Sequence, residues 1–153
     1  MKHRLVSPVL MWLIVIAGVI AAVHILPKHA FFRRNVTVYI VLAAAAVNWL
    51  YFMIVGGVTL KTPQRSAAGI AKVVTTGIYA KVRHPIYSAD IILAWAIFLL
   101  FPTPGVLVGI IWLTVVMLFW MRLEESALLD RFGEEYAEYK ARTPMVIPRY
   151  FGK

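Results

Sequence analysis

Four apolar runs dominate the sequence and decide what kind of fold it can adopt. Two of them, 8–26 and 36–57, are each about 20 residues long, enough to cross ~30 Å of bilayer hydrocarbon at ~1.5 Å per residue. Two more, 86–101 and 103–121, are separated by a tight turn rich in proline and glycine. The pattern predicts an all-α integral membrane protein with about four transmembrane helices.

The third run is the shortest of the four and contains a charge. As a helix, residues 86–101 span only ~24 Å, and Asp90 lies among them. Because a carboxylate is costly at the centre of a bilayer, we expect this helix to begin in the membrane interface. Asp90 then lies within a turn or two of the lipid headgroups.

Composition supports this class and excludes others. Of 153 residues, 61% are hydrophobic and 15% are charged, which is more apolar surface than one small soluble core can bury. The net charge of +9 lies between the apolar runs without a nucleic-acid recognition motif, so anionic lipid is its expected partner. There is no cysteine, and the four histidines lack ligand spacing, so we expect neither disulfide nor metal. We expect one domain over 1–153 with no obligate protein partner.

The distribution of Lys and Arg predicts the orientation in the membrane. Segments 1–7, 59–85 and 122–153 hold two, five and six basic residues, against three in the loop between the first two runs. Basic residues concentrate on the cytoplasmic side of membrane proteins. We therefore expect a multi-pass protein of the cell membrane with both termini in the cytosol.

Two polar segments, 75–90 and 122–148, carry the chemistry of the sequence. A single apolar hairpin separates them, so folding should return the second segment to the membrane face where the first begins. The tail from Arg122 is helical in pattern but too polar to span, and Gly133 interrupts it. We expect two interfacial helices there, the second ending by Arg142 because Thr143 precedes a proline.

In the first polar segment, Pro85 suits the first turn of a helix and places Tyr87 and Asp90 on one face. Arg83 and His84 would then lie at the N-terminus of that helix, where backbone amides and a guanidinium can meet an anion. The residues alone leave a second interpretation open, in which Arg83 and His84 only mark the cytoplasmic end of a span. Asp90 likewise fits either a functional role or an ion pair with Arg122.

In the second segment, Glu124 and Glu125 are adjacent, so on a helix their side chains point about 100° apart. Glu125 shares a side with Leu129 and Phe132, and we expect it to face the bundle. Glu124 would orient a substrate or a partner arginine. An acidic first turn of a surface helix remains the alternative for both.

Together these motifs resemble the isoprenylcysteine carboxyl methyltransferase family and its phospholipid N-methyltransferase relatives. The resemblance rests on Arg-His-Pro-x-Tyr at 83–87, an apolar hairpin, Glu-Glu, Phe-Gly-x-x-Tyr-x-x-Tyr at 132–139 and a closing proline. It departs from the family pattern at Ile78, where proline is usual, and at Ala89, where glycine is usual.

The resemblance implies a membrane enzyme that uses S-adenosylmethionine to methylate a lipophilic acceptor by direct in-line transfer. The acceptor, a carboxylate or a lipid amine, would enter from the bilayer and the cofactor from the cytosol. The residues implied for catalysis are Arg122, Glu124 and Asp90, where Arg122 would place a carboxylate and either Glu124 or Asp90 would deprotonate an amine. The residues implied for cofactor binding are Tyr79, Arg83, His84, Pro85, Tyr87, Glu125 and Tyr136.

Two other functions are compatible with a short polytopic chain. One is a small four-helix transporter that uses Asp90, and the other is a nicotinamide-dependent reductase of related architecture. The transporter leaves both polar segments without a function. Binding of adenosylhomocysteine against NADPH separates the methyltransferase from the reductase.

Overall fold

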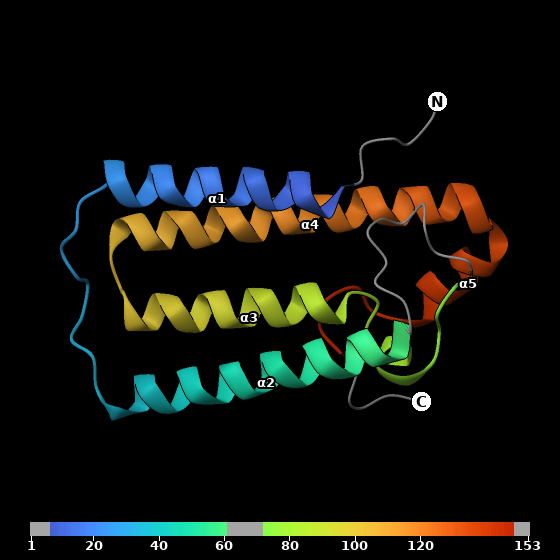
Figure 1. The fold of residues 1–153 in the computed structure, drawn as a ribbon, viewed down its shortest axis with the longest axis horizontal. Helices are drawn as coiled ribbons and strands as arrows, with labels where there is room; N and C mark the ends of the chain where they lie inside the picture. Colours follow the sequence, from blue (N-terminus) through green and yellow to red (C-terminus); the bar gives the residue numbers. More distant parts are fainter. Residues whose placement is uncertain (1–6, 61–71, 149–153) are drawn as a thin grey trace.

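The computed structural model describes residues 7–60 and 72–148, and these form a helical bundle (Figure 1). Its long helices are α1 Pro8–Ile25, α2 Val36–Leu60, α3 Pro85–Leu100 and α4 Pro104–Phe132. A short 3-10 helix, η2 (Gly77–Ala80), precedes α3, and α5 (Glu134–Arg142) follows α4. The predicted all-α membrane class is confirmed. Three helices, α1, α2 and α4, are long and apolar enough to cross a bilayer, and α3 is shorter, as its sequence predicts.

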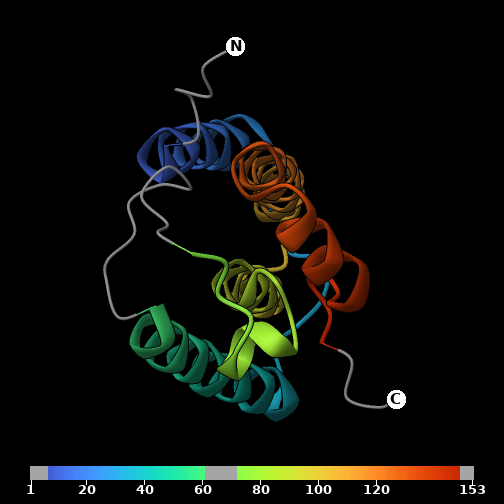
Figure 2. The same ribbon diagram turned by 90° about the vertical axis from the view of Figure 1, so that its right-hand side faces the viewer.

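The bundle consists of two helix pairs. Seen end-on, α1 lies beside α4 and α2 lies beside α3, while α3 and α4 join the pairs (Figure 2). The core between α1 and α4 is built around Met11, Val15 and Met117. Many other apolar side chains point outward, where lipid can contact them. The backbone needs no water there, because each helix satisfies its own backbone hydrogen bonds.

Close contact between α1 and α4 depends on a glycine, Gly105, which has no side chain. A Cβ atom at Gly105 would lie 2.8 Å from the carbonyl oxygen of Ala22 and 2.9 Å from the Cα of Val23. Helices in membranes approach each other closely where small residues face the neighbour, since little hydrophobic force drives them together. Gly105 therefore sets the spacing at the start of α4.

The tail differs from its prediction. No break separates the fourth span from Arg122, because α4 continues without interruption to Phe132. The expectation of two separate tail helices is wrong, since neither glycine nor proline occurs between Gly109 and Gly133 to stop the helix. Gly133 ends α4 with φ 54°, and α5 ends at Arg142 as predicted. The longer α4 carries its polar end past the apolar bundle towards α5.

The spacing between α1 and α4 leads to a first prediction. Gly105→Ala forces the two backbones apart and should lower the free energy of unfolding by about 1–3 kcal/mol. The measurement is unfolding in maltoside micelles, followed by circular dichroism. Gly57→Ala is the matched control: it also lies in an apolar helix, but among the described residues no atom beyond its chain neighbours and its own helix backbone lies within 4 Å of the added Cβ. The control should stabilise slightly, by up to about 1 kcal/mol, and equal losses in both variants would contradict the argument.

Candidate functional site

The two polar segments meet at one end of the bundle, as the sequence predicts. The chain after α5 runs back along the start of α3, where the amide of Arg83 donates to the carbonyl of Pro144 at 2.9 Å. The amide of His84 donates to the carbonyl of Met145 at 3.2 Å. The hydroxyl of Ser88 donates to the carbonyl of Val146 at 2.8 Å. These bonds fix residues 144–146 against the start of α3.

The same bonds correct one expectation. His84 does precede Pro85, which begins α3 as predicted. The amides of Arg83 and His84, however, are bonded to the tail and do not face a cavity as anion donors. The physical reason is that two irregular segments buried together must satisfy their backbone polar groups, and here each satisfies the other.

Arg83 forms the centre of a buried ionic network. Its Nε donates to Oε1 of Glu125 at 2.7 Å, and its Nη1 donates to the carbonyls of Lys140, at 2.9 Å, and Thr143. Glu125 is only 3% exposed and also accepts from Nζ of Lys140 at 3.0 Å. A buried charge is tolerated when it is paired and hydrogen-bonded, and both conditions hold here. We call Arg83, Glu125 and Lys140 the Arg83–Glu125 network.

His84 lies between the two adjacent glutamates. Its Nε2 is 3.2 Å from Oε1 of Glu125, and its Nδ1 is 3.9 Å from Oε2 of Glu124. The ring stacks on Tyr87 with centroids 5.8 Å apart, and the Tyr87 hydroxyl donates to Oε1 of Glu124 at 2.8 Å. Each carboxylate thus approaches the imidazole at a different nitrogen, which fits their angular separation on α4.

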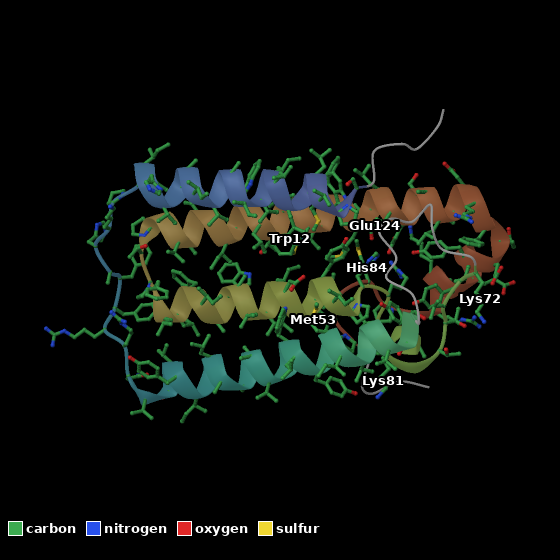
Figure 3. The ribbon with its side chains drawn as sticks, in the orientation of Figure 1. Trp12, Met53, Lys72, Lys81, His84 and Glu124 are labelled. Atoms are coloured by element: carbon green, nitrogen blue, oxygen red, sulfur yellow. The ribbon has the colours of Figure 1, made fainter. Side chains whose placement is uncertain are left out.

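A cavity of about 470 Å³ opens beside these residues, a size typical of small-molecule sites. In Figure 3, Trp12 and Glu124 lie on the α1–α4 side of this end, and Met53 lies on the α2–α3 side. Most of its wall is apolar or aromatic. The lining residues, in chain order, are Pro8, Trp12, Trp49, Met53, Val73, Val74, Tyr79, Arg83, His84, Pro85, Ile86, Tyr87, Asp90, Glu124, Leu128, Tyr136 and Tyr139.

Most of the predicted site residues share this cavity. Those that line it are Tyr79, Arg83, His84, Pro85, Tyr87, Asp90, Glu124 and Tyr136. Two do not. Arg122 is exposed on α4 and is absent from the cavity wall. Glu125 is buried, and points into the bundle as predicted, but it faces the Arg83–Glu125 network and not the cavity.

Sequence reasoning missed the partner of Asp90. The indole Nε1 of Trp49 donates to Oδ1 of Asp90 at 2.7 Å, so within the described residues the alternative ion pair with Arg122 is not formed. Trp49 lies within an apolar run, and no sequence pattern pairs it with a residue 41 positions away.

Sequence reasoning also missed Tyr139. Its hydroxyl donates to the carbonyl of Tyr79 at 2.7 Å, and its spacing of three from Tyr136 is the signal that points to it.

Tyr79, Tyr136 and Tyr139 stay neutral at ordinary pH. Burial, together with the charge of Glu124, raises the pKa of Tyr79 to about 12. Burial also raises the pKa of Tyr136 and of Tyr139 above the usual range of a phenol. These groups therefore offer hydroxyl hydrogen bonds and aromatic faces to a ligand, and no negative charge.

The comparisons with known proteins point to one family. A sequence model described as phospholipid methyltransferase matches residues 36–135. Methanethiol S-methyltransferase 1 of Bradyrhizobium diazoefficiens is 41% identical over 71 residues, covering 46% of this chain and 24% of that protein. Protein-S-isoprenylcysteine O-methyltransferase of Mus musculus is 38% identical over 78 residues, covering 49% of this chain and 27% of that protein. The chain thus spans about a quarter of the length of these curated relatives.

The Arg83–Glu125 network leads to a second prediction. Glu125→Gln leaves the buried guanidinium of Arg83 without its counter-charge and should lower the free energy of unfolding by about 3 kcal/mol or more. Denaturant unfolding of the protein in micelles, followed by circular dichroism, measures this loss.

Glu138→Gln is the control for that experiment. It removes the same charge from an exposed position on α5 and should change stability by less than about 0.5 kcal/mol. A loss no larger for Glu125→Gln than for this control would show that the network does not hold the site together.

Proposed function

The chain belongs to the phospholipid methyltransferase family, and from this premise we propose that it is an integral membrane methyltransferase that uses S-adenosylmethionine and acts on a lipophilic acceptor. One observation carries the proposal: the two polar segments and the adjacent ends of α1 and α2 line a cavity in which the carboxylate of Glu124 lies among tyrosines and apolar side chains. The relatives are named for sulfur and oxygen acceptors, so their names do not select an acceptor for this chain.

The residues of the cavity fit the proposed cofactor. S-adenosylmethionine carries a purine, ribose hydroxyls, an amino acid group and a cationic sulfonium. Tyr79 and Tyr136 offer aromatic faces for the purine, and Glu124 offers a carboxylate for a hydroxyl or a cation. When bound, the cofactor would supply an electrophilic methyl group.

The remaining cofactor residues are proposed to position these groups. Tyr87 holds Glu124 through its hydroxyl, and Glu125 holds Arg83 and His84 from behind the cavity wall. Pro85 fixes the start of α3 below them. Direct methyl transfer needs alignment of the reacting atoms and exclusion of water, and it needs no covalent intermediate. Rigid positioning of these residues favours such a transfer.

Among the proposed catalytic residues, Asp90 and Glu124 line the cavity and are the candidates for accepting a proton. Arg122 is exposed and absent from the cavity wall. Its suggested role in placing a carboxylate acceptor therefore has no geometric support. Neither the transporter nor the nicotinamide-dependent reductase receives support from the family match.

The proposed site faces the cytosol. The start of α1, the end of α2, the start of α3 and the end of α4 all lie at the end of the bundle where α5 lies (Figure 1). This is the end that the distribution of Lys and Arg assigns to the cytosol. A soluble cofactor would enter the cavity from that side, and a lipophilic acceptor from the bilayer.

A third prediction tests the cofactor. Calorimetry on the purified protein in micelles should detect S-adenosylmethionine binding, and Glu124→Gln should weaken it about tenfold or more, because a hydrogen bond to a charged group contributes about 1.5–3 kcal/mol. Glu134→Gln, an exposed carboxylate on α5, should bind as the unchanged protein does.

Two results would count against the proposal. One is a folded protein that binds no S-adenosylmethionine or adenosylhomocysteine. The other is binding of NADPH in their place, which would favour the reductase. Equal binding by Glu124→Gln and the unchanged protein would keep the cofactor but remove Glu124 from its site.

A further inference from the structure

The end of the bundle opposite α5 is formed by the loop between α1 and α2 and by the turn between α3 and α4 (Figure 1). The amide of Phe31 in the loop donates to the carbonyl of Pro102 in the turn at 2.7 Å, so the two are joined directly. The ring of Phe98, near the end of α3, meets two rings of the loop edge-on. Its centroid is 6.4 Å from that of Phe31 and 6.3 Å from that of Phe32. These contacts hold the loop against α3 and the turn.

Two adjacent arginines, Arg33 and Arg34, follow these phenylalanines in the loop and are exposed. The guanidinium carbon of Arg34 lies 5.9 Å from the ring centroid of Phe101, the residue that follows α3. Phe31, Phe32 and Phe101 are 50%, 42% and 50% exposed, so a large aromatic surface lies beside the two charges. We call Phe31, Phe32, Arg33, Arg34 and Phe101 the aromatic–basic platform.

No carboxylate balances the charge of the platform. All seven acidic residues of the sequence lie between positions 90 and 138. At ~1.5 Å per residue, Asp90 lies about 15 Å along α3 from Leu100, and Glu124 lies about 30 Å along α4 from Pro104. Exposed charges more than about 8 Å apart are largely screened at physiological ionic strength. Within residues 7–60 and 72–148, neither arginine of the platform forms an ion pair.

The position of the platform in the bundle determines what it meets. The helices that it joins are apolar, so their ends lie at the boundary between hydrocarbon and lipid headgroups. Exposed phenylalanine rings are stabilised there by acyl chains, and guanidinium groups bind phosphate oxygens through paired N–H donors. A zwitterionic headgroup carries its own cation beside the phosphate, whereas an anionic headgroup leaves the phosphate charge uncompensated. Two arginines without a carboxylate therefore favour the anionic headgroup.

We propose that the aromatic–basic platform binds an anionic phospholipid in the leaflet at this end of the bundle. The phosphate lies between Arg33 and Arg34, and the acyl chains pack on the exposed rings. Net charge alone does not locate such a site, because the basic residues are spread over all the polar segments. The lipid is a bound partner and not a methyl acceptor, since the cavity lies at the other end of the bundle. The inference does not depend on the proposed function.

The test compares two lipids with the same acyl chains, phosphatidylglycerol and phosphatidylcholine. Native mass spectrometry of the whole chain in maltoside micelles, with each lipid titrated, gives the dissociation constant of the first lipid bound. The unchanged protein should bind phosphatidylglycerol about tenfold more tightly or more. The double variant Arg33→Gln/Arg34→Gln should bind both lipids within about threefold of each other, because each basic residue near an anionic surface contributes about fivefold.

The matched control is Lys81→Gln/Arg142→Gln. It removes two exposed basic charges from the end of the bundle near α5 and should retain the preference for phosphatidylglycerol. An equal loss of preference in both double variants would show that net charge selects the lipid without the platform, and would overturn the proposal. Equal binding of the two lipids by the unchanged protein would overturn it as well.

A single substitution tests the aromatic part of the platform without altering its charge. Phe101→Leu keeps an apolar side chain but removes the ring that faces the guanidinium of Arg34. It should weaken phosphatidylglycerol about two- to fivefold, the contribution of an exposed cation–π contact, and change phosphatidylcholine less. A phosphatidylglycerol affinity that Phe101→Leu leaves unchanged would contradict the proposed site, even if the double arginine variant did not fold, because a purely basic patch needs no ring.

Discussion

A buried ion pair between Arg83 and Glu125 joins the loop before α3 to the polar end of α4. The same guanidinium donates to the carbonyls of Lys140 and Thr143, so it also ties down the end of α5 and the chain that follows. A charge buried to this extent cannot remain unpaired without a cost of several kcal/mol. The ion pair therefore holds the start of α3, the end of α4 and the tail in one arrangement. The cavity depends on this arrangement.

This pairing gives two adjacent carboxylates different roles. Glu125 is 3% exposed and committed to Arg83, His84 and Lys140, whereas Glu124 lines the cavity and is held by Tyr87. Neighbouring positions on a helix point about 100° apart, so one can serve the scaffold while the other serves a ligand. Loss of binding after substitution of Glu125 would thus report on the scaffold first, and only Glu124 tests contact with a ligand directly.

The sequence predicts the fold well where a local signal exists. Apolar runs locate the spans, Pro85 marks the start of α3, and Gly133 marks the end of α4. It predicts less where the outcome depends on distant partners. The bond from Trp49 to Asp90 joins residues 41 positions apart, and no local pattern announces it. Arg122 was expected to place a carboxylate acceptor, but the rotation of α4 turns it outward. The sequence located the site, and the side chains that face the cavity were set by packing.

The helices that build the cavity are not all covered by the family match. Residues 36–135 include α2, α3 and α4, while α1 lies before them and supplies Trp12 to the cavity wall. The match thus includes Arg83, His84 and Glu124, whereas Trp12 on α1 and Tyr139 on α5 line the cavity from outside it. The motifs therefore do not account for the whole cavity wall, and relatives similar to this chain bear names that specify different acceptors.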